Sequence, residues 1–207
     1  MLKLSLLEIF TIVTAFQLMM LGFVLLAKRE KQSNLILSFY MFSNALLLIW
    51  FLFSILNMVQ MPTIPAFYYL LGPLMFLYVK SLCVKSFRLE PGQWVHGVAF
   101  VVMLLYPGLK LFLISDSRPP QWDYYENTLS QIILHAQIGF YVFMSFRTIS
   151  FYRKEIKNHY SAVEHINLSW LLLIIVAFSA MWLADFIAFL LAIFKLDSES
   201  SAYILIV

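Results

Sequence analysis

Three ionisable side chains stand out in this sequence because the segments around them are strongly apolar. Lys110, His135 and Asp185 each lie in a stretch rich in Leu, Ile and Phe. An ionisable group at the centre of a bilayer costs about 2.5–3.5 kcal/mol on insertion scales, so each such group needs a partner or a function. A carboxylate in this setting either pairs with a neighbouring cation or receives a cation from outside the protein.

Further polar and aromatic residues fall in the same half of the predicted spans as these three. The full candidate set is Glu8, Tyr68, Tyr69, Tyr106, Lys110, Gln131, His135, Trp182 and Asp185. Their shared depth predicts a polar pocket that opens to the outer side, with Glu8 and Asp185 pairing with Lys110 or His135, or binding a cation. The same residues are also consistent with a buried structural network, or with end residues that snorkel to the interface. Asp185 fits snorkelling poorly, because its side chain is short and lies deep.

Motifs for catalysis are missing from the sequence. It contains no HExxH, GxSxG, Walker or paired-cysteine pattern, and the single Cys83 cannot form an internal disulfide. The four histidines fall at different predicted depths, which does not favour a metal or haem site. We therefore expect no enzymatic activity, no cofactor and no bound metal.

The composition determines the class of fold that must position these groups. Of 207 residues, 62% are hydrophobic and 12% charged, with a mean hydropathy of +0.85. A water-soluble domain of this size cannot hide so much apolar surface, so lipid must cover most of it. We predict an all-α polytopic transmembrane bundle over residues 1–207. The predicted spans are 5–27, 34–58, 64–84, 94–114, 128–148 and 168–194, and 202–207 is expected to begin an incomplete seventh span. Gly72 and Pro73 should kink the third.

The basic residues predict the orientation of these spans. Lys28, Arg29 and Lys31 follow the first span, and further Lys and Arg residues follow the third and the fifth. The alternate connections are poor in basic residues or carry more acidic ones. Because Lys and Arg concentrate in cytoplasmic loops, we expect the N-terminus to lie outside.

The connection between the fifth and sixth spans is basic, and its sequence predicts a break between two helices. Ser161 and Glu164 have the spacing of a capping box, which predicts the start of a new helix. One interpretation is an anchor on anionic lipid. The other is a relay that passes an outer binding event to the cytoplasm. The candidate relay residues are Arg153, Lys154, Lys157, Ser161 and Glu164.

Two stretches carry a resemblance to a known family. They are residues 71–81 (LGPLMFLYVKS) and 152–171 (YRKEIKNHYSAVEHINLSWL). With its layout of spans, the chain resembles the N-terminal membrane domain of membrane-bound AraC-type helix-turn-helix regulators from Bacteroidetes-like bacteria. Similar membrane domains also precede sensor histidine kinases.

The resemblance implies the signal-input domain of a one-component transcription regulator in the bacterial inner membrane, with a periplasmic N-terminus. Its partners would be the lipid bilayer, a small ligand or envelope signal, and a second copy in a homodimer. DNA would be bound only through a cytoplasmic domain that this chain does not include. The alternatives are the membrane domain of a sensor histidine kinase and a small carrier or channel. A transport path needs polar residues through both halves of the membrane, and the inner halves of these spans hold few.

Overall fold

A computed structural model describes residues 5–56, 64–84, 87–113, 121–159 and 168–194. Within these ranges every regular element is a helix, which confirms the all-α fold. The elements are α1 (Leu6–Ala27), α2 (Gln32–Ile55), α3 (Tyr68–Cys83), the 3-10 helix η1 (Pro91–Gly97), α4 (Val98–Leu113), α5 (Gln121–His159) and α6 (Ser169–Ile193).

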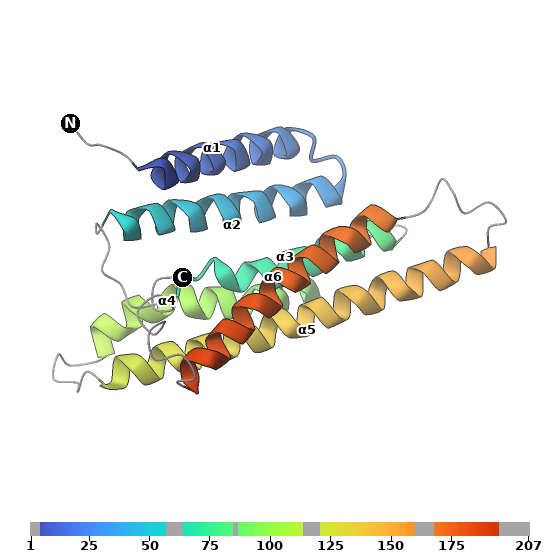
Figure 1. The fold of residues 1–207 in the computed structure, drawn as a ribbon. Coiled ribbons are helices and arrows are strands. Elements are labelled where there is room, and N and C mark those ends of the chain that lie inside the picture. Colours follow the sequence, from blue (N-terminus) through green and yellow to red (C-terminus); the bar gives the residue numbers. More distant parts are fainter. Residues whose placement is uncertain (1–4, 57–63, 85–86, 114–120, 160–167, 195–207) are drawn as a thin grey trace.

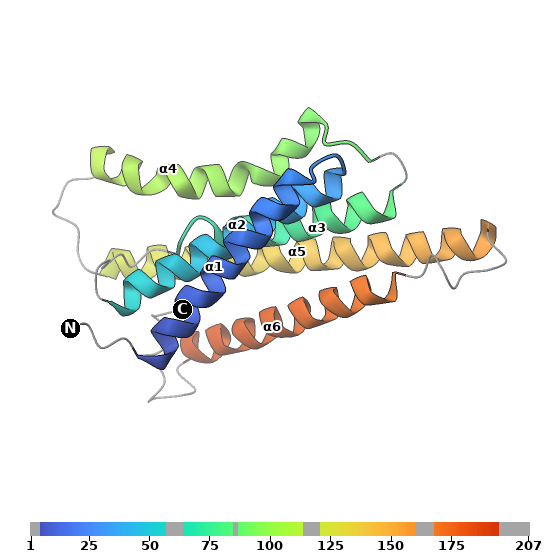
Figure 2. The ribbon, with the colours of Figure 1, turned by 90° about the horizontal axis from the view of Figure 1, so that it is seen from above.

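The helices lie roughly along one direction, and successive α-helices run in opposite senses (Figure 1). α1 packs on α2, α2 on α3, and α3 on α5. Seen from above, α4 and α6 lie on opposite sides of α5 (Figure 2). α5 is therefore the helix around which the second half of the chain is arranged.

Five helical segments in the described residues are long and apolar enough to cross a membrane. They are Leu6–Ala27, Gln32–Ile55, Pro91–Lys110, Trp122–Ile156 and Ser169–Ile193. α3 is apolar but only 16 residues long, so its axis measures about 24 Å against a hydrocarbon core of about 30 Å. The predicted segment 202–207 lies outside the described residues.

Large apolar side chains are exposed along the outer helices. Phe16 on α1 is 65% exposed, and Leu173 and Met181 on α6 are 70% and 74% exposed. A water-soluble monomer rarely presents apolar patches of this extent. Lipid contact accounts for them, as expected for helices that cross a membrane.

The contact between α3 and α5 is close because of a glycine. A Cβ atom at Gly72 would lie 3.1 Å from the ring of Tyr141 and 3.5 Å from the Cα atom of Ile138. The α-helix runs through Pro73 without interruption. One turn further on, Met75, Val79 and Cys83 of α3 form a core with Ile149 of α5 and with Leu171 and Ile175 of α6.

α5 is longer than the predicted span 128–148, with 39 residues and a length of about 58 Å. Hydropathy marks only the apolar middle of a helix, whereas the polar ends of α5 still make backbone hydrogen bonds. Asp123 in the first turn also favours a helix there, because a carboxylate complements the positive end of the helix dipole.

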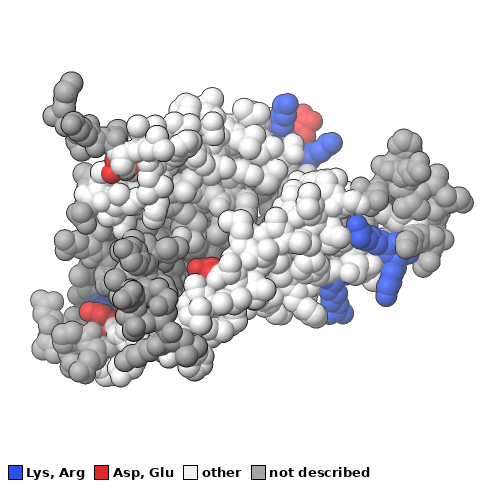
Figure 3. Space-filling view, viewed as in Figure 1, with Lys and Arg blue, Asp and Glu red and all other residues white. Residues whose placement is uncertain are grey.

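The described Lys and Arg residues gather mainly at one end of the bundle, with some acidic residues among them (Figure 3). Glu30, Glu90 and Glu155 are each within two residues of one of these basic residues in the sequence. The end at which α1, α3 and α5 finish is here called the basic end. The described basic residues at this end are Lys28, Arg29, Lys31, Lys80, Arg88, Arg147, Arg153 and Lys154. At the opposite end lie the carboxylates of Glu8, Asp123 and Glu126, together with Lys110.

Candidate functional site

Two of the predicted polar residues meet between α5 and α6. His135 Nε2 lies 4.0 Å from Asp185 Oδ2. His135 is buried, with 5% of its side chain exposed, whereas Asp185 is 60% exposed. The imidazole also lies against the rings of Phe186 and Phe189, with centroids 5.2 and 4.9 Å away. A buried imidazole thus faces a carboxylate that is open to the surroundings of α6.

Trp182 packs beside this pair. Its ring stacks on Phe186 at a centroid distance of 5.7 Å and an interplanar angle of 6°. Its far edge fits against Gly139 of α5, where a Cβ atom would lie 3.1 Å from the indole. We call His135, Trp182 and Asp185 the α5–α6 polar cluster. The small residue at position 139 lets the indole approach α5 closely.

Buried polar atoms without a hydrogen-bond partner are found in and beside this cluster. Among the described residues, those within the cluster are His135 Nδ1 and Trp182 Nε1, and Gln137 Oε1 is a further such atom on another face of α5. Each unsatisfied polar group in an apolar medium costs several kcal/mol. An indole N–H donates, an amide oxygen accepts, and an imidazole nitrogen does either according to its tautomer. The region therefore offers both donors and acceptors to a small polar molecule.

The two tyrosines at the start of α3 have different surroundings. Tyr69 is 1% exposed, and its hydroxyl donates to the Ser130 carbonyl of α5 at 2.7 Å. Gln137 Nε2 donates to the Tyr69 carbonyl at 3.1 Å. These contacts join α3 to α5. Tyr68 packs with Trp182 around the same core, so it borders the α5–α6 polar cluster.

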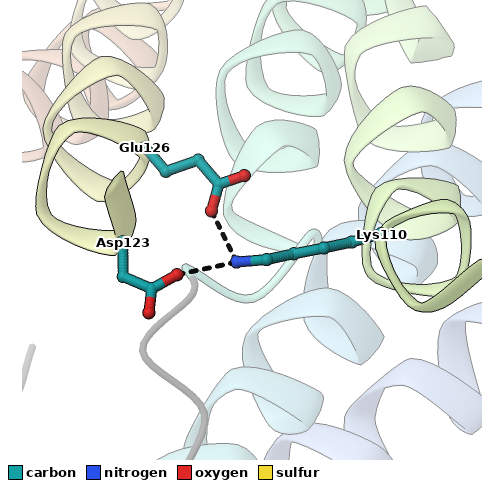
Figure 4. A network of polar contacts seen from close by, with 3 residues as sticks. All are labelled: Lys110, Asp123 and Glu126. Carbon is teal, nitrogen blue, oxygen red and sulfur yellow. Dashed lines mark hydrogen bonds and ion pairs between the residues drawn. The ribbon is translucent and has the colours of Figure 1, made fainter. Parts of the chain in front are cut away.

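Lys110 is held apart from that cluster by other partners. Its ammonium lies 2.9 Å from Asp123 and 2.6 Å from Glu126 at the start of α5 (Figure 4). Of the pairings that the sequence left open, the one between Lys110 and Asp185 or Glu8 is not formed in the described residues. Because α5 begins at Gln121, the two acids lie three residues apart on one helical face, where the hydropathy pattern had placed them in a loop.

Glu8 has a local role at the start of α1. Its carboxylate accepts from the Ser5 backbone N–H at 2.6 Å, and the Ser5 hydroxyl accepts from the Glu8 N–H at 3.3 Å. This is a capping box, which satisfies two otherwise unpaired donors. The predicted pairing of Glu8 with Lys110 or His135 is not formed. Half-buried Tyr106 lies on α4, and half-buried Gln131 lies one turn before His135 on α5.

The candidate relay residues are described in part. Arg153 Nη2 donates to the Ser169 hydroxyl at 3.5 Å, so the end of α5 touches the first residue of α6. Lys154 is exposed on α5. Lys157 belongs to α5 and its side chain is not described, whereas Ser161 and Glu164 lie outside the described residues.

Sequence reasoning missed several contributors. Gln137, whose amide bonds to the Tyr69 carbonyl of α3, is not among the predicted residues, and no spacing in the sequence indicates it. Asp123 and Glu126 were counted only as loop charges. His96 Nδ1 also lies 2.9 Å from the Tyr141 hydroxyl, a pairing that joins η1 to α5 and that no spacing in the sequence indicates.

No group of three metal-ligating side chains gathers within the part of the chain that the structure describes. The chain matches no family model, no curated protein and no solved structure.

Proposed function

We propose that this chain is the membrane-embedded signal-input domain of a one-component transcription regulator. In this proposal an outer ligand or envelope signal acts at the α5–α6 polar cluster. The response then passes to a cytoplasmic DNA-binding domain. The observation that carries the proposal is that one helix, α5, holds the buried imidazole of His135 at one level and the Arg153 contact to α6 at another.

The geometry of α5 supports a relay across the membrane. From His135 to Arg153 the helix rises about 27 Å, close to the thickness of the hydrocarbon core. At both levels α5 contacts α6, through Asp185 at one and Ser169 at the other. A ligand that draws His135 and Asp185 together would tilt or slide α6 against α5. That movement would change the contact at the basic end.

The chemistry of the cluster supports a polar or cationic ligand. Asp185 presents a carboxylate with 60% of its side chain exposed. His135 and Trp182 supply buried polar atoms without partners among the described residues. Aromatic rings of Trp182, Phe186 and Phe189 border the site, and aromatic faces attract cations.

The basic end is proposed to face the cytoplasm of a bacterium, which places the N-terminus in the periplasm. Described Lys and Arg residues gather at this end (Figure 3), in agreement with the positive-inside rule. The resemblance to membrane-bound AraC-type regulators supports the same arrangement and the nature of the output.

The test replaces the chromosomal gene for the full natural protein with variants and measures all transcripts. His135→Ala and Asp185→Asn are expected to change the same limited set of transcripts as deletion does, by about fivefold or more. Ser179→Ala on α6 is the matched control, because its hydroxyl bonds to the Ile175 carbonyl of its own helix at 2.6 Å. The control should match wild type. All variants should reach the membrane in equal amounts.

Three outcomes contradict the proposal. Unchanged transcripts on deletion would exclude a regulator. ATP-dependent labelling of the full protein on histidine would indicate a sensor kinase. Uptake of a solute that depends on Asp185 would indicate a carrier.

A further inference from the structure

A cleft of about 1070 Å³ opens between α3 and α5 at the basic end. It is separate from the α5–α6 polar cluster. Six of its lining residues carry the argument: Phe76, Lys80, Met144, Arg147, Phe151 and Lys154. The cleft therefore combines long cationic side chains with large apolar ones.

The order of these residues along the helices explains the combination. On α5, Met144, Arg147, Phe151 and Lys154 follow one another at intervals of three and four residues, so they share one face. On α3, Phe76 and Lys80 are likewise one turn apart. Apolar and cationic side chains thus alternate along both walls, in the direction of the helix axes.

The charge of the cleft is positive. Lys80, Arg147 and Lys154 contribute three cations, and Glu155 is the only carboxylate among the described lining residues. Arg147 and Lys154 are exposed. The Lys80 ammonium lies 6.0 Å from the ring centroids of both Phe76 and Phe87, and these rings hold it beside the cleft.

We propose that this cleft binds a phosphate group, and that the phosphate belongs to the headgroup of an anionic membrane lipid. Arg147 offers a planar guanidinium that bonds two phosphate oxygens at once, and the two lysines add point charges. Along the axis of α5, Arg147 and Lys154 are about 10.5 Å apart. Their long side chains can reach a headgroup between them.

The apolar wall favours a lipid over a water-soluble phosphate. Phe76, Met144 and Phe151 border the cations within the same cleft. A soluble phosphate has no apolar part to cover these side chains, whereas an acyl chain does. Basic pockets between helices on the cytoplasmic side commonly hold anionic headgroups. The proposal does not depend on the regulator function.

The experiment measures lipid binding to the full natural protein by native mass spectrometry, with phosphatidylglycerol and phosphatidylcholine as probes. The double variant Arg147→Gln, Lys154→Gln is expected to bind phosphatidylglycerol roughly thirtyfold more weakly, from the usual contribution of each cation near anionic lipid. Lys28→Gln, Arg29→Gln is the matched control. It removes two cations from the turn after α1 at the same end of the bundle, outside the cleft.

The control should retain wild-type affinity within about twofold, because Lys28 and Arg29 do not line the cleft. A general surface potential, which acts on all cations alike, would instead weaken binding equally in both double variants. An equal loss in both double variants would overturn the proposal, as would equal binding of the two lipids by wild type. Competition by inorganic phosphate at the same affinity would overturn the lipid assignment and point to a free phosphate.

A measurement on wild type covers the case in which the Gln variant does not fold. Hydrogen exchange is compared in nanodiscs with and without phosphatidylglycerol. The proposal predicts that adding phosphatidylglycerol slows exchange more in residues 144–154 than in residues 28–31. Equal effects at both places would contradict it.

Discussion

Replacing Gly72 or Gly108 with alanine compares a glycine packed against another helix with a glycine on an open helix surface. Both lie inside α-helices and both neighbour a proline. A Cβ atom at Gly72 would lie 3.1 Å from Tyr141 and 3.5 Å from the Ile138 backbone, whereas one at Gly108 would meet nothing within 4 Å among the described residues. Alanine should therefore destabilise the protein at position 72 and be tolerated at position 108.

The size of each effect follows from two terms. Alanine in place of glycine stabilises an open helix by up to about 1 kcal/mol. Overpacking at a close contact costs about 1–3 kcal/mol. Gly108→Ala should thus leave stability unchanged or raise it by up to about 1 kcal/mol. Gly72→Ala should lower it by about 0.5–2 kcal/mol, because the ring of buried Tyr141, 3.1 Å from the new Cβ atom, must shift by a few tenths of an ångström within a packed interface. Gly72→Leu should lower it further.

The assay heats detergent-solubilised protein and measures the fraction that remains monodisperse in size exclusion. For a chain of this length, 1 kcal/mol corresponds to about 2–4 °C in Tm. Gly72→Ala is expected to melt several degrees below Gly108→Ala. Equal melting temperatures, or greater damage at Gly108, would refute the packing of α3 on α5 described above.

Three further predictions use the same melting assay. Lys110→Met should lower stability by about 1–3 kcal/mol, because it removes the ammonium that lies 2.9 Å from Asp123 and 2.6 Å from Glu126, whose side chain is only 20% exposed. A change below about 0.3 kcal/mol would show that these ion pairs do not hold α4 to α5. Tyr69→Phe should cost about 1 kcal/mol through the lost bond to the Ser130 carbonyl, and an unchanged Tm would contradict that bond. Ser38→Ala should lower stability by about 1 kcal/mol, since this fully buried hydroxyl donates to the Gly22 carbonyl of α1 at 2.8 Å. A melting temperature equal to that of wild type would contradict this contribution.

The helical fold could be predicted because hydropathy reports which segments must be covered by lipid. The predicted first and last complete spans, 5–27 and 168–194, nearly coincide with α1 (Leu6–Ala27) and α6 (Ser169–Ile193). The ends of α5 could not be found this way. They are polar, and a polar segment is helical or irregular according to local backbone bonding that hydropathy does not report.

The candidate site could be predicted only as a set of alternatives. Residue depth placed His135 and Asp185 at compatible levels, and they do meet at 4.0 Å. Depth alone did not reveal that Asp123 and Glu126 bind Lys110, because that pairing depends on where α5 begins. The cleft between α3 and α5 could not be predicted from the sequence for a related reason. The sequence does not show which faces of α3 and α5 pack together, so it does not indicate that Lys80 and Arg147 line the same cleft.

The most direct test of the central claim is whether the full natural protein occupies DNA in living cells. Cells are crosslinked, the protein is isolated from the membrane fraction, and the attached DNA is sequenced. The regulator proposal predicts reproducible enrichment of a few sites next to the transcripts that change on deletion, with occupancy altered by Asp185→Asn and unaltered by Ser179→Ala. DNA recovered at the level of an unrelated membrane protein would contradict it.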